Sequence, residues 1–252
     1  MANNLRLLWY NLIDLNVTLT ASSATTSATN IAHEHKGKIW RTSGTSATLI
    51  VDLQAPDNSV RCFALTGHNF TANAVIQLAH STDNVTYTDI AGTNGNAMVL
   101  AGFFTLTSSR YWRFTLTDTN NPDGYLEVGR IFLGEYIEPS NNIDVGYVIE
   151  LVSHAKTKIT RGLQRITDEA EERLRVTLRL SSLTESEALL QFMALLLNIG
   201  SKDHIFLSVF PEDETALGET FALYGRFVQL PNMRSPSINI YATDEFVFEE
   251  SI

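Results

Sequence analysis

Two histidine-containing segments in the first third of the chain have residue types that could bind a ligand. His33 and His35 are two residues apart, so in an extended segment both imidazoles lie on one face, as a metal pair requires. No third ligand follows at a recognisable spacing. We therefore expect a loop with exposed histidines, no metal site and no cofactor. His68 and Asn69 follow an apolar segment at a glycine turn, where they either bond backbone groups or contact a ligand.

Catalytic chemistry has no comparable signal. The chain contains 28 acidic residues, and nothing singles out a carboxylate pair of the kind that hydrolyses glycosides. There is no glycine-rich phosphate loop, no G-x-S-x-G motif and no cysteine spacing typical of zinc. We therefore predict that the protein is not an enzyme.

The charge distribution argues against a nucleic-acid-binding surface. The formal net charge is −10, with 8 basic and 11 acidic residues up to position 140 and 10 basic and 17 acidic after it. Phosphate contacts need clustered Lys and Arg, so we expect no specific nucleic-acid binding.

No segment approaches the roughly 20 apolar residues that span a bilayer, so we expect no membrane insertion.

The chain has one cysteine, Cys62, in an apolar segment, which predicts a buried and unreactive thiol.

The N-terminal apolar run contains only one basic residue, Arg6, and is interrupted early by Asn11 and Asp14. We expect that it is not a signal peptide.

Short strand-like segments follow one another between residues 40 and 134. The predicted strands are 48–53, 60–65, 74–79, 110–117 and 126–134, separated by turn clusters at 56–58, 92–96 and 120–124. Those clusters are rich in Gly, Asn, Asp and Pro, which tolerate turns. Strands at this spacing without an intervening helix indicate an antiparallel β-sandwich.

The segment 138–142 (Glu-Pro-Ser-Asn-Asn) is the best candidate for a domain boundary. A single helix is then predicted over 185–199: Thr184 and Glu187 fit a capping box, and Gly200 fits a C-terminal cap. Strands are predicted at 173–180, 204–210, 221–230 and 237–248. Because the helix is apolar on nearly every side, we expect a neighbouring subunit to cover part of it.

Residues 20–137 resemble the discoidin or galactose-binding-like jelly roll. The resemblance is carried in order by Trp40, Val51-Asp52-Leu53, Ser81-x-Asp83-Asn84 with Tyr87, Tyr111-Trp112-Arg113 and Glu127–Ile131. It implies an attachment module and favours a structural turn at His68 and Asn69. It also implies that loops at one end could bind a carbohydrate or a partner, through His33, His35, Trp40, Arg41, His68 and Asn69. Trp40 is then either a plug of the core or a platform on which a sugar ring stacks.

Residues 141–252 resemble the tail-tube-type domain of tailed-phage distal tail and baseplate proteins. The features are Arg161-Gly162, the alternating strand 173–180, the capped helix and the strand ending Tyr224-Gly225-Arg226-Phe227. The resemblance implies a ring of copies, hexameric in that family, around a channel through which DNA passes. An acidic domain suits a channel that repels phosphate.

Together these patterns predict a mainly β protein of two domains. Residues 1–139 form a jelly roll, and residues 140–252 form a tail-tube-like β-sandwich with one α-helix. The leading hypothesis is a structural component of a phage virion tail, synthesised in the host cytoplasm, that forms a ring and docks tail proteins or fibres. The alternative is a non-catalytic attachment module that recognises host-surface glycans.

Overall fold

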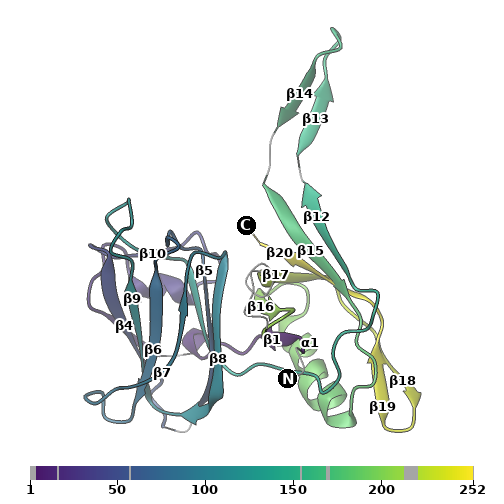
Figure 1. Ribbon diagram of the computed structural model, residues 1–252. Helices are drawn as coiled ribbons and strands as arrows, with labels where there is room; N and C mark the ends of the chain where they lie inside the picture. The colour runs from purple at the N-terminus through teal and green to yellow at the C-terminus, as the bar shows by residue number, and fades with distance from the viewer. Residues whose placement is uncertain are drawn as a thin grey trace.

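The computed structural model describes residues 4–15, 17–56, 58–153, 155–168, 171–212 and 221–251. These residues form two β-rich bodies that lie side by side (Figure 1). We call them the jelly roll, built from residues between 12 and 134, and the hairpin domain, built from residues 4–8 and residues between 137 and 251. The sheets are antiparallel and the fold is mainly β, as predicted.

The jelly roll is a sandwich of two antiparallel sheets. The larger sheet has the order β2 (Thr18–Ala21), β4 (Ser46–Asp52), β9 (Tyr111–Thr117), β6 (Val75–Ser81) and β7 (Thr88–Asn94). The smaller sheet has the order β11 (Arg130–Gly134), β5 (Ser59–Thr66) and β8 (Val99–Ser108). A short pair of β3 (Trp40–Arg41) with β10 (Glu127–Val128) and two 3₁₀ turns, η1 (Leu12–Asp14) and η2 (Ala28–Ala32), complete it.

Alternation of apolar and polar residues explains the central strands. Buried and partly exposed residues alternate along β4 and β9, so Leu49 and Val51 on one strand and Phe114 on the other face the core. The predicted strands 48–53, 60–65, 74–79 and 110–117 are confirmed within two residues at each end. Strands β7 and β8 were not predicted. The sequence pattern predicts a turn at residues 92–96, whereas β7 extends to Asn94; it carries Gly92 and has exposed residues along much of its length.

The turn after β6 also follows its sequence pattern. Asp83 Oδ1 accepts hydrogen bonds from the backbone N–H groups of Val85 and Thr86, each at 2.9 Å, and from the Ser81 hydroxyl at 2.8 Å. These bonds lower the pKa of the Asp83 carboxyl to about 2, because they stabilise its charged form. Asn84 adopts a positive φ of 61°, which asparagine tolerates.

The hairpin domain contains a six-stranded antiparallel sheet. Its order is β1 (Arg6–Leu8), β16 (Ile205–Ser208), β17 (Ala222–Gln229), β20 (Phe246–Glu250), β15 (Glu172–Leu178) and β12 (Val148–Ser153). Two additional hairpins are formed by β13 (Lys156–Ile159) with β14 (Arg165–Asp168) and by β18 (Met233–Ser237) with β19 (Ile240–Thr243). The predicted single strand 237–248 is wrong, since β18 ends, β19 follows and β20 begins within that range.

The first strand of the chain belongs to this sheet. Arg6 pairs with Ser208 and Leu8 with Phe206, so the jelly roll is inserted between β1 and the rest of the hairpin domain. The predicted boundaries, 1–139 and 140–252, assign β1 to the jelly roll, whereas its hydrogen bonds join it to the second sheet. The chain also returns beside β1, because Leu7 and Ile137 exchange backbone hydrogen bonds of 3.0 and 2.9 Å.

The segment 138–142 is held by hydrogen bonds to two parts of the hairpin domain. The Asn4 side chain donates to Pro139 O at 2.9 Å, and the backbone N–H of Ser140 donates to Glu187 Oε1 at 2.6 Å. These contacts connect the segment to the residues before β1 and to the start of the helix.

Both faces of the sheet are covered where β1, β16 and β17 lie together. Leu7 and Leu207 face the core under the helix, whereas Leu8, Phe206 and Tyr224 face the jelly roll. On the jelly-roll side the contacts come from the smaller sheet, through Cys62, Ala64, Val99 and Phe132. Burial on both faces explains why consecutive residues are apolar without alternation, Leu7 and Leu8 in β1 and Ile205 to Leu207 in β16.

The predicted capping box is confirmed at the start of the helix. Thr184 Oγ1 accepts from the N–H of Glu187 at 3.3 Å, and Glu187 Oε2 accepts from the N–H of Thr184 at 2.7 Å. The helix begins as one π-helical segment, η3 (Ser186–Phe192), and continues as α1 (Met193–Ile199). It ends at Gly200, whose φ is +59° as a glycine cap allows. No helix in the described ranges is long and apolar enough to cross a membrane.

The sheet covers only one side of this helix. Phe192 and Leu195 are buried against it, while Leu190 and Leu197 are 73% and 79% exposed. The expectation that a neighbouring subunit covers the other side stays a prediction.

Strands β12 and β15 continue into β13 and β14, which project far from both bodies (Figure 1). We call residues 148–178 the long hairpin. Residues 156–159 are exposed on both faces, and apolar Ile159 and Leu163 are exposed near its tip. The predicted strand 173–180 is confirmed as β15, whereas β12, β13 and β14 were not predicted. A strand exposed on both faces, such as β13, has no buried apolar stripe to reveal its period.

The single thiol is a native reporter of the contact between the two bodies. Cys62 is fully buried in that contact, as predicted, and burial raises its pKa well above the usual value, which disfavours the reactive thiolate. Phe206→Ala removes the ring that packs on Phe132 and Tyr224. We expect a loss of about 3–5 kcal/mol in unfolding free energy. Labelling of Cys62 by Ellman's reagent should accelerate more than tenfold, since each 1.4 kcal/mol is a factor of ten.

Leu106→Ala, at a half-exposed position of β8, is the control and should leave the labelling rate unchanged. A Phe206→Ala protein with a lowered melting temperature and an unchanged labelling rate would show that the thiol is shielded by the jelly roll alone.

Candidate functional site

The loops at one end of the jelly roll are joined by a network around Glu127. Arg41 Nε donates to Glu127 Oε1 at 2.6 Å, and the N–H of Glu127 donates to Asn69 Oδ1 at 2.8 Å. The Arg41 guanidinium also lies over the Tyr125 ring, 4.5 Å from its centroid. The hydrogen bond to Glu127 raises the pKa of Arg41. We call Arg41, Asn69, Asp123, Tyr125 and Glu127 the loop-end cluster.

Two of the predicted site residues hold this end together. Asn69 Nδ2 donates to Asp123 Oδ2 at 2.9 Å and to Tyr125 O at 3.1 Å, so all parts of its amide are used. His68 Nε2 donates to Ala97 O at 2.9 Å, and His68 Nδ1 accepts from a backbone N–H at 3.3 Å. That arrangement requires neutral imidazole, and burial lowers the pKa of His68 accordingly.

Trp40 lies in the core beneath the cluster. Its side chain is fully buried, and Nε1 donates to Ser23 O at 3.0 Å. Of the two alternatives for this residue, the geometry is that of a core plug.

His33 and His35 lie elsewhere. Their rings stack on each other at 5.3 Å between centroids, and His35 lines a pocket of about 270 Å³ that also includes His204 and Tyr224 of the hairpin domain. The structure thus brings Arg41 and Asn69 together through Glu127 but places the histidine pair at the contact between the bodies. Within the described ranges, no three or more His, Cys, Asp or Glu residues are grouped so as to hold a metal ion.

Residues that were not predicted make the loop end rigid. Buried Asp118 accepts from the Thr71 N–H and the Thr71 hydroxyl, both at 2.7 Å, and from Asn121 Nδ2 at 3.1 Å. Asn121 Nδ2 also donates to Asn69 O at 2.9 Å. The turn-forming composition of 120–124 gave a signal for the loop, but nothing in the sequence indicated its partners.

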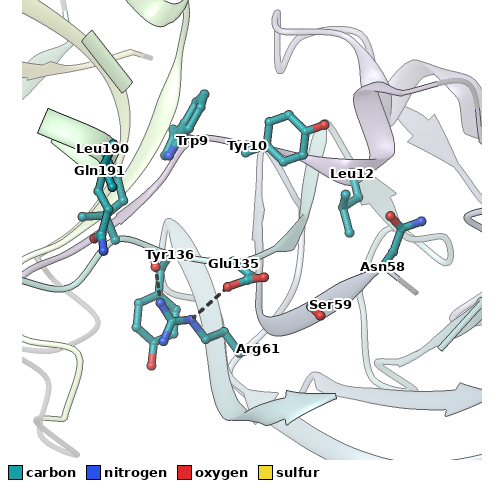
Figure 2. Close-up of a pocket in the computed structure, with 11 residues that line it drawn as sticks. Trp9, Tyr10, Leu12, Asn58, Ser59, Arg61, Glu135, Tyr136, Leu190 and Gln191 are labelled. Carbon is teal, nitrogen blue, oxygen red and sulfur yellow. Dashed lines mark hydrogen bonds and ion pairs between the residues drawn. The ribbon is translucent and has the colours of Figure 1, made fainter. Parts of the chain in front are cut away.

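A pocket of about 530 Å³ lies at the junction of the two bodies (Figure 2). The two segments that cross between the bodies contribute Trp9, Tyr10, Glu135 and Tyr136, and strand β5 of the jelly roll contributes Arg61. Asn58 and Ser59 lie on the jelly-roll side, and Leu190 and Gln191 lie on the helix side. We call this the junction pocket.

No family model and no curated protein sequence matches this chain. Solved structures with a similar fold include CpGH89CBM32-5 from Clostridium perfringens, in complex with GalNAc-β-1,3-galactose. The identity is 14%, the TM-score is 0.43, and the match covers 50% of this chain and 100% of that chain. Chitosan-binding module 1 of a Paenibacillus sp. IK-5 chitosanase/glucanase is 20% identical with a TM-score of 0.42, covering 50% of this chain and 99% of that one.

A Ruminococcus gnavus GH29 fucosidase in complex with fucose is also similar, with 14% identity and a TM-score of 0.43. The match covers 50% of this chain and 26% of the fucosidase chain.

Trp40→Ala separates its two predicted roles. Because the ring is buried in the core, we expect the substitution to lower the unfolding free energy by about 3–5 kcal/mol. Chemical denaturation followed by circular dichroism measures this loss. Arg41→Ala, at a partly exposed position whose ion pair is solvated, should cost far less stability. Equal, small effects of both substitutions would place Trp40 at the surface.

Proposed function

We propose that this protein is a non-catalytic assembly protein whose copies join through the long hairpin. The observation that carries the proposal is the outer strand of the six-stranded sheet. Strand β12 pairs with β15 on one side and with no described strand on the other, and it leads into a hairpin that leaves both bodies. An unpaired edge is a template for pairing with another chain.

The side chains of the long hairpin support the same proposal. Leu151 is 66% exposed on β12, and Val148, Ile159 and Leu163 are exposed as well. Apolar side chains that recur along an unpaired strand and an extended arm are typical of a surface that is covered in an assembly. The exposed side of the helix, with Leu190 and Leu197, adds a second such surface on the same domain.

Charge favours a second copy of this chain as the partner. Residues 155–168 contain four basic residues and one acidic residue, which is a formal charge of +3. The net charge of the whole chain is −10, so the remaining residues together carry −13. Lys156, Lys158, Arg161 and Arg165 form no ion pair with any described residue. A basic arm on an acidic molecule is attracted to the body of a neighbouring copy.

An arm that binds a different surface of the next copy makes a head-to-tail contact, which forms a ring when the rotation closes. We extend the proposal to a ring in the tail of a phage virion, at its tip or baseplate, with the jelly roll outside the ring to dock tail proteins or fibres. The resemblance of residues 141–252 to tail-tube-type domains motivates this finer step.

Leu151→Asp tests assembly through the long hairpin. A charge at this exposed position disrupts apolar contact between copies without entering the core, so we expect an unchanged circular dichroism spectrum and conversion of oligomers to monomers. Mass photometry measures the distribution of masses.

The matched control is Leu106→Asp, the same substitution at a half-exposed position of β8 in the jelly roll, which should retain the oligomers. A wild-type protein that is monomeric at every concentration, both alone and mixed with purified virion tails, would exclude the proposal.

Glycan recognition by the jelly roll is the second candidate function. The loop-end cluster favours it, because Tyr125 offers an aromatic face beside the charged groups of Arg41, Asp123 and Glu127. An aromatic ring can contact the apolar face of a sugar while neighbouring charged groups bond its hydroxyls.

If this cluster binds glycans, Tyr125→Ala should reduce affinity at least tenfold on a glycan array that includes GalNAc-β-1,3-galactose, fucose and chitosan fragments. Tyr87→Ala is the matched control, since Tyr87 also lies under an arginine, Arg113 at 4.1 Å, but at the other end of the sandwich. Absence of binding by the wild-type protein, or equal loss in both variants, would exclude the loop end as a glycan site.

A further inference from the structure

The junction pocket has walls from both bodies that are fixed before any ligand arrives. Leu7 and Ile137 bond the two crossing segments to each other, and Asn11 bridges to Gly134 at the jelly-roll end. Asn11 Nδ2 also donates to Ile131 O at 2.9 Å. The residues that lie between these anchors, Trp9, Tyr10, Glu135 and Tyr136, are therefore held in place while their side chains remain accessible.

Aromatic rings form the apolar part of the lining. The Trp9 and Tyr10 rings meet edge to face at 5.6 Å between centroids, and Tyr10 is 50% exposed although it lies next to a core. Figure 2 shows both rings on one side of the pocket, with Tyr136, Glu135 and Arg61 on another. Partly exposed Trp and Tyr rings at a concave site supply large, rigid contact area for a ligand.

A donor and an acceptor are fixed opposite these rings. The Arg61 guanidinium lies over the Tyr136 ring at 3.8 Å and donates to Tyr136 O, while Nε lies 3.9 Å from Glu135 Oε2. Arg61 Nε is buried and has no hydrogen-bond partner among the described residues. Asn58, Ser59 and Gln191 add neutral amide and hydroxyl groups around them.

The balance of these groups narrows the ligand class. Arg61 and Glu135 are the charged residues of the lining, and their charges cancel, so the pocket does not select a phosphate or another anion. A wholly apolar ligand would leave the amide, hydroxyl and carboxylate groups without partners, which is unfavourable. A metal ion would find only one carboxylate. A ligand with an apolar face and many hydroxyls can pack on the aromatic rings and also form hydrogen bonds with the polar groups of the lining.

We propose that the junction pocket, through Trp9, Tyr10, Arg61, Glu135 and Gln191, binds a neutral saccharide. The ring face of the sugar stacks on Tyr10 or Trp9, and adjacent hydroxyls bond Glu135, Arg61 and Gln191. The volume of about 530 Å³ lies within the range of roughly 300–1,000 Å³ usual for small-ligand sites. This site is separate from the loop-end cluster and from the long hairpin, so it does not depend on either proposed function.

The tryptophans provide a direct readout. The chain has three, and Trp40 and Trp112 are fully buried, so fluorescence that acrylamide can quench comes from Trp9. The probes are neutral disaccharides at millimolar concentration: GalNAc-β-1,3-galactose, lactose, cellobiose, maltose and N,N′-diacetylchitobiose. We expect at least one to reduce the quenching of Trp9 severalfold and to show saturation-transfer NMR contacts with the protein.

Variants then assign the site. Tyr10→Ala and Glu135→Gln, both at half-exposed positions, should weaken binding of that disaccharide at least tenfold without lowering the melting temperature. Tyr87→Ala, a tyrosine under Arg113 that belongs to neither candidate site, is the matched control and should bind normally. Tyr125→Ala tests the loop-end cluster as the alternative site. Absence of any effect of the disaccharides on Trp9 overturns the proposal. Binding that is lost in Tyr125→Ala and kept in Tyr10→Ala also overturns it and assigns the sugar to the loop end. Mass photometry of the same samples reports self-assembly independently.

Discussion

The arrangement of the two bodies depends on a three-stranded part of one sheet that is buried on both faces. In β1, β16 and β17, one set of alternate side chains packs under the helix and the other set packs on the smaller sheet of the jelly roll. Leu7 and Leu8 illustrate this, since adjacent residues of one short strand serve two different cores. A sheet with both faces apolar cannot be exposed to water without a large cost, so the jelly roll is part of the packing of the hairpin domain.

This constraint also positions the surfaces on which recognition depends. Contact through β16 and β17 leaves β12 as the outer strand at the opposite edge of the sheet, and the long hairpin projects from that side (Figure 1). The same contact brings the crossing segments beside the helix, where the junction pocket lies. The loop-end cluster is organised differently, by local turns and by buried Asp118 within the jelly roll.

The sequence predicted the elements that are formed by interactions between residues close together in the chain. The capping box at Thr184, the turn at Asp83 and the alternation in β9 depend on residues a few positions apart. Strand β1 could not be predicted in the same way, because three residues, Arg6-Leu7-Leu8, do not indicate which sheet they join. The candidate sites were predicted less well than the fold. The hydrogen bond between Arg41 and Glu127 joins residues 86 positions apart, which no local pattern reveals. The sequence also does not indicate whether a tryptophan such as Trp40 is buried in the core or exposed to solvent.

The pairing of β1 with β16 has a consequence for synthesis on the ribosome. Arg6 meets Ser208, which is translated 202 residues later, whereas every strand of the jelly roll has its partners within residues 18–134. The jelly roll can therefore complete its sheets while β1, with its two leucines, still has no partner strand. Contacts this distant in sequence form slowly, and unpaired apolar strands are prone to aggregation in the meantime. A folded jelly roll can therefore be joined to an unpaired β1, with Leu7 and Leu8 still without their core, until β16 is translated.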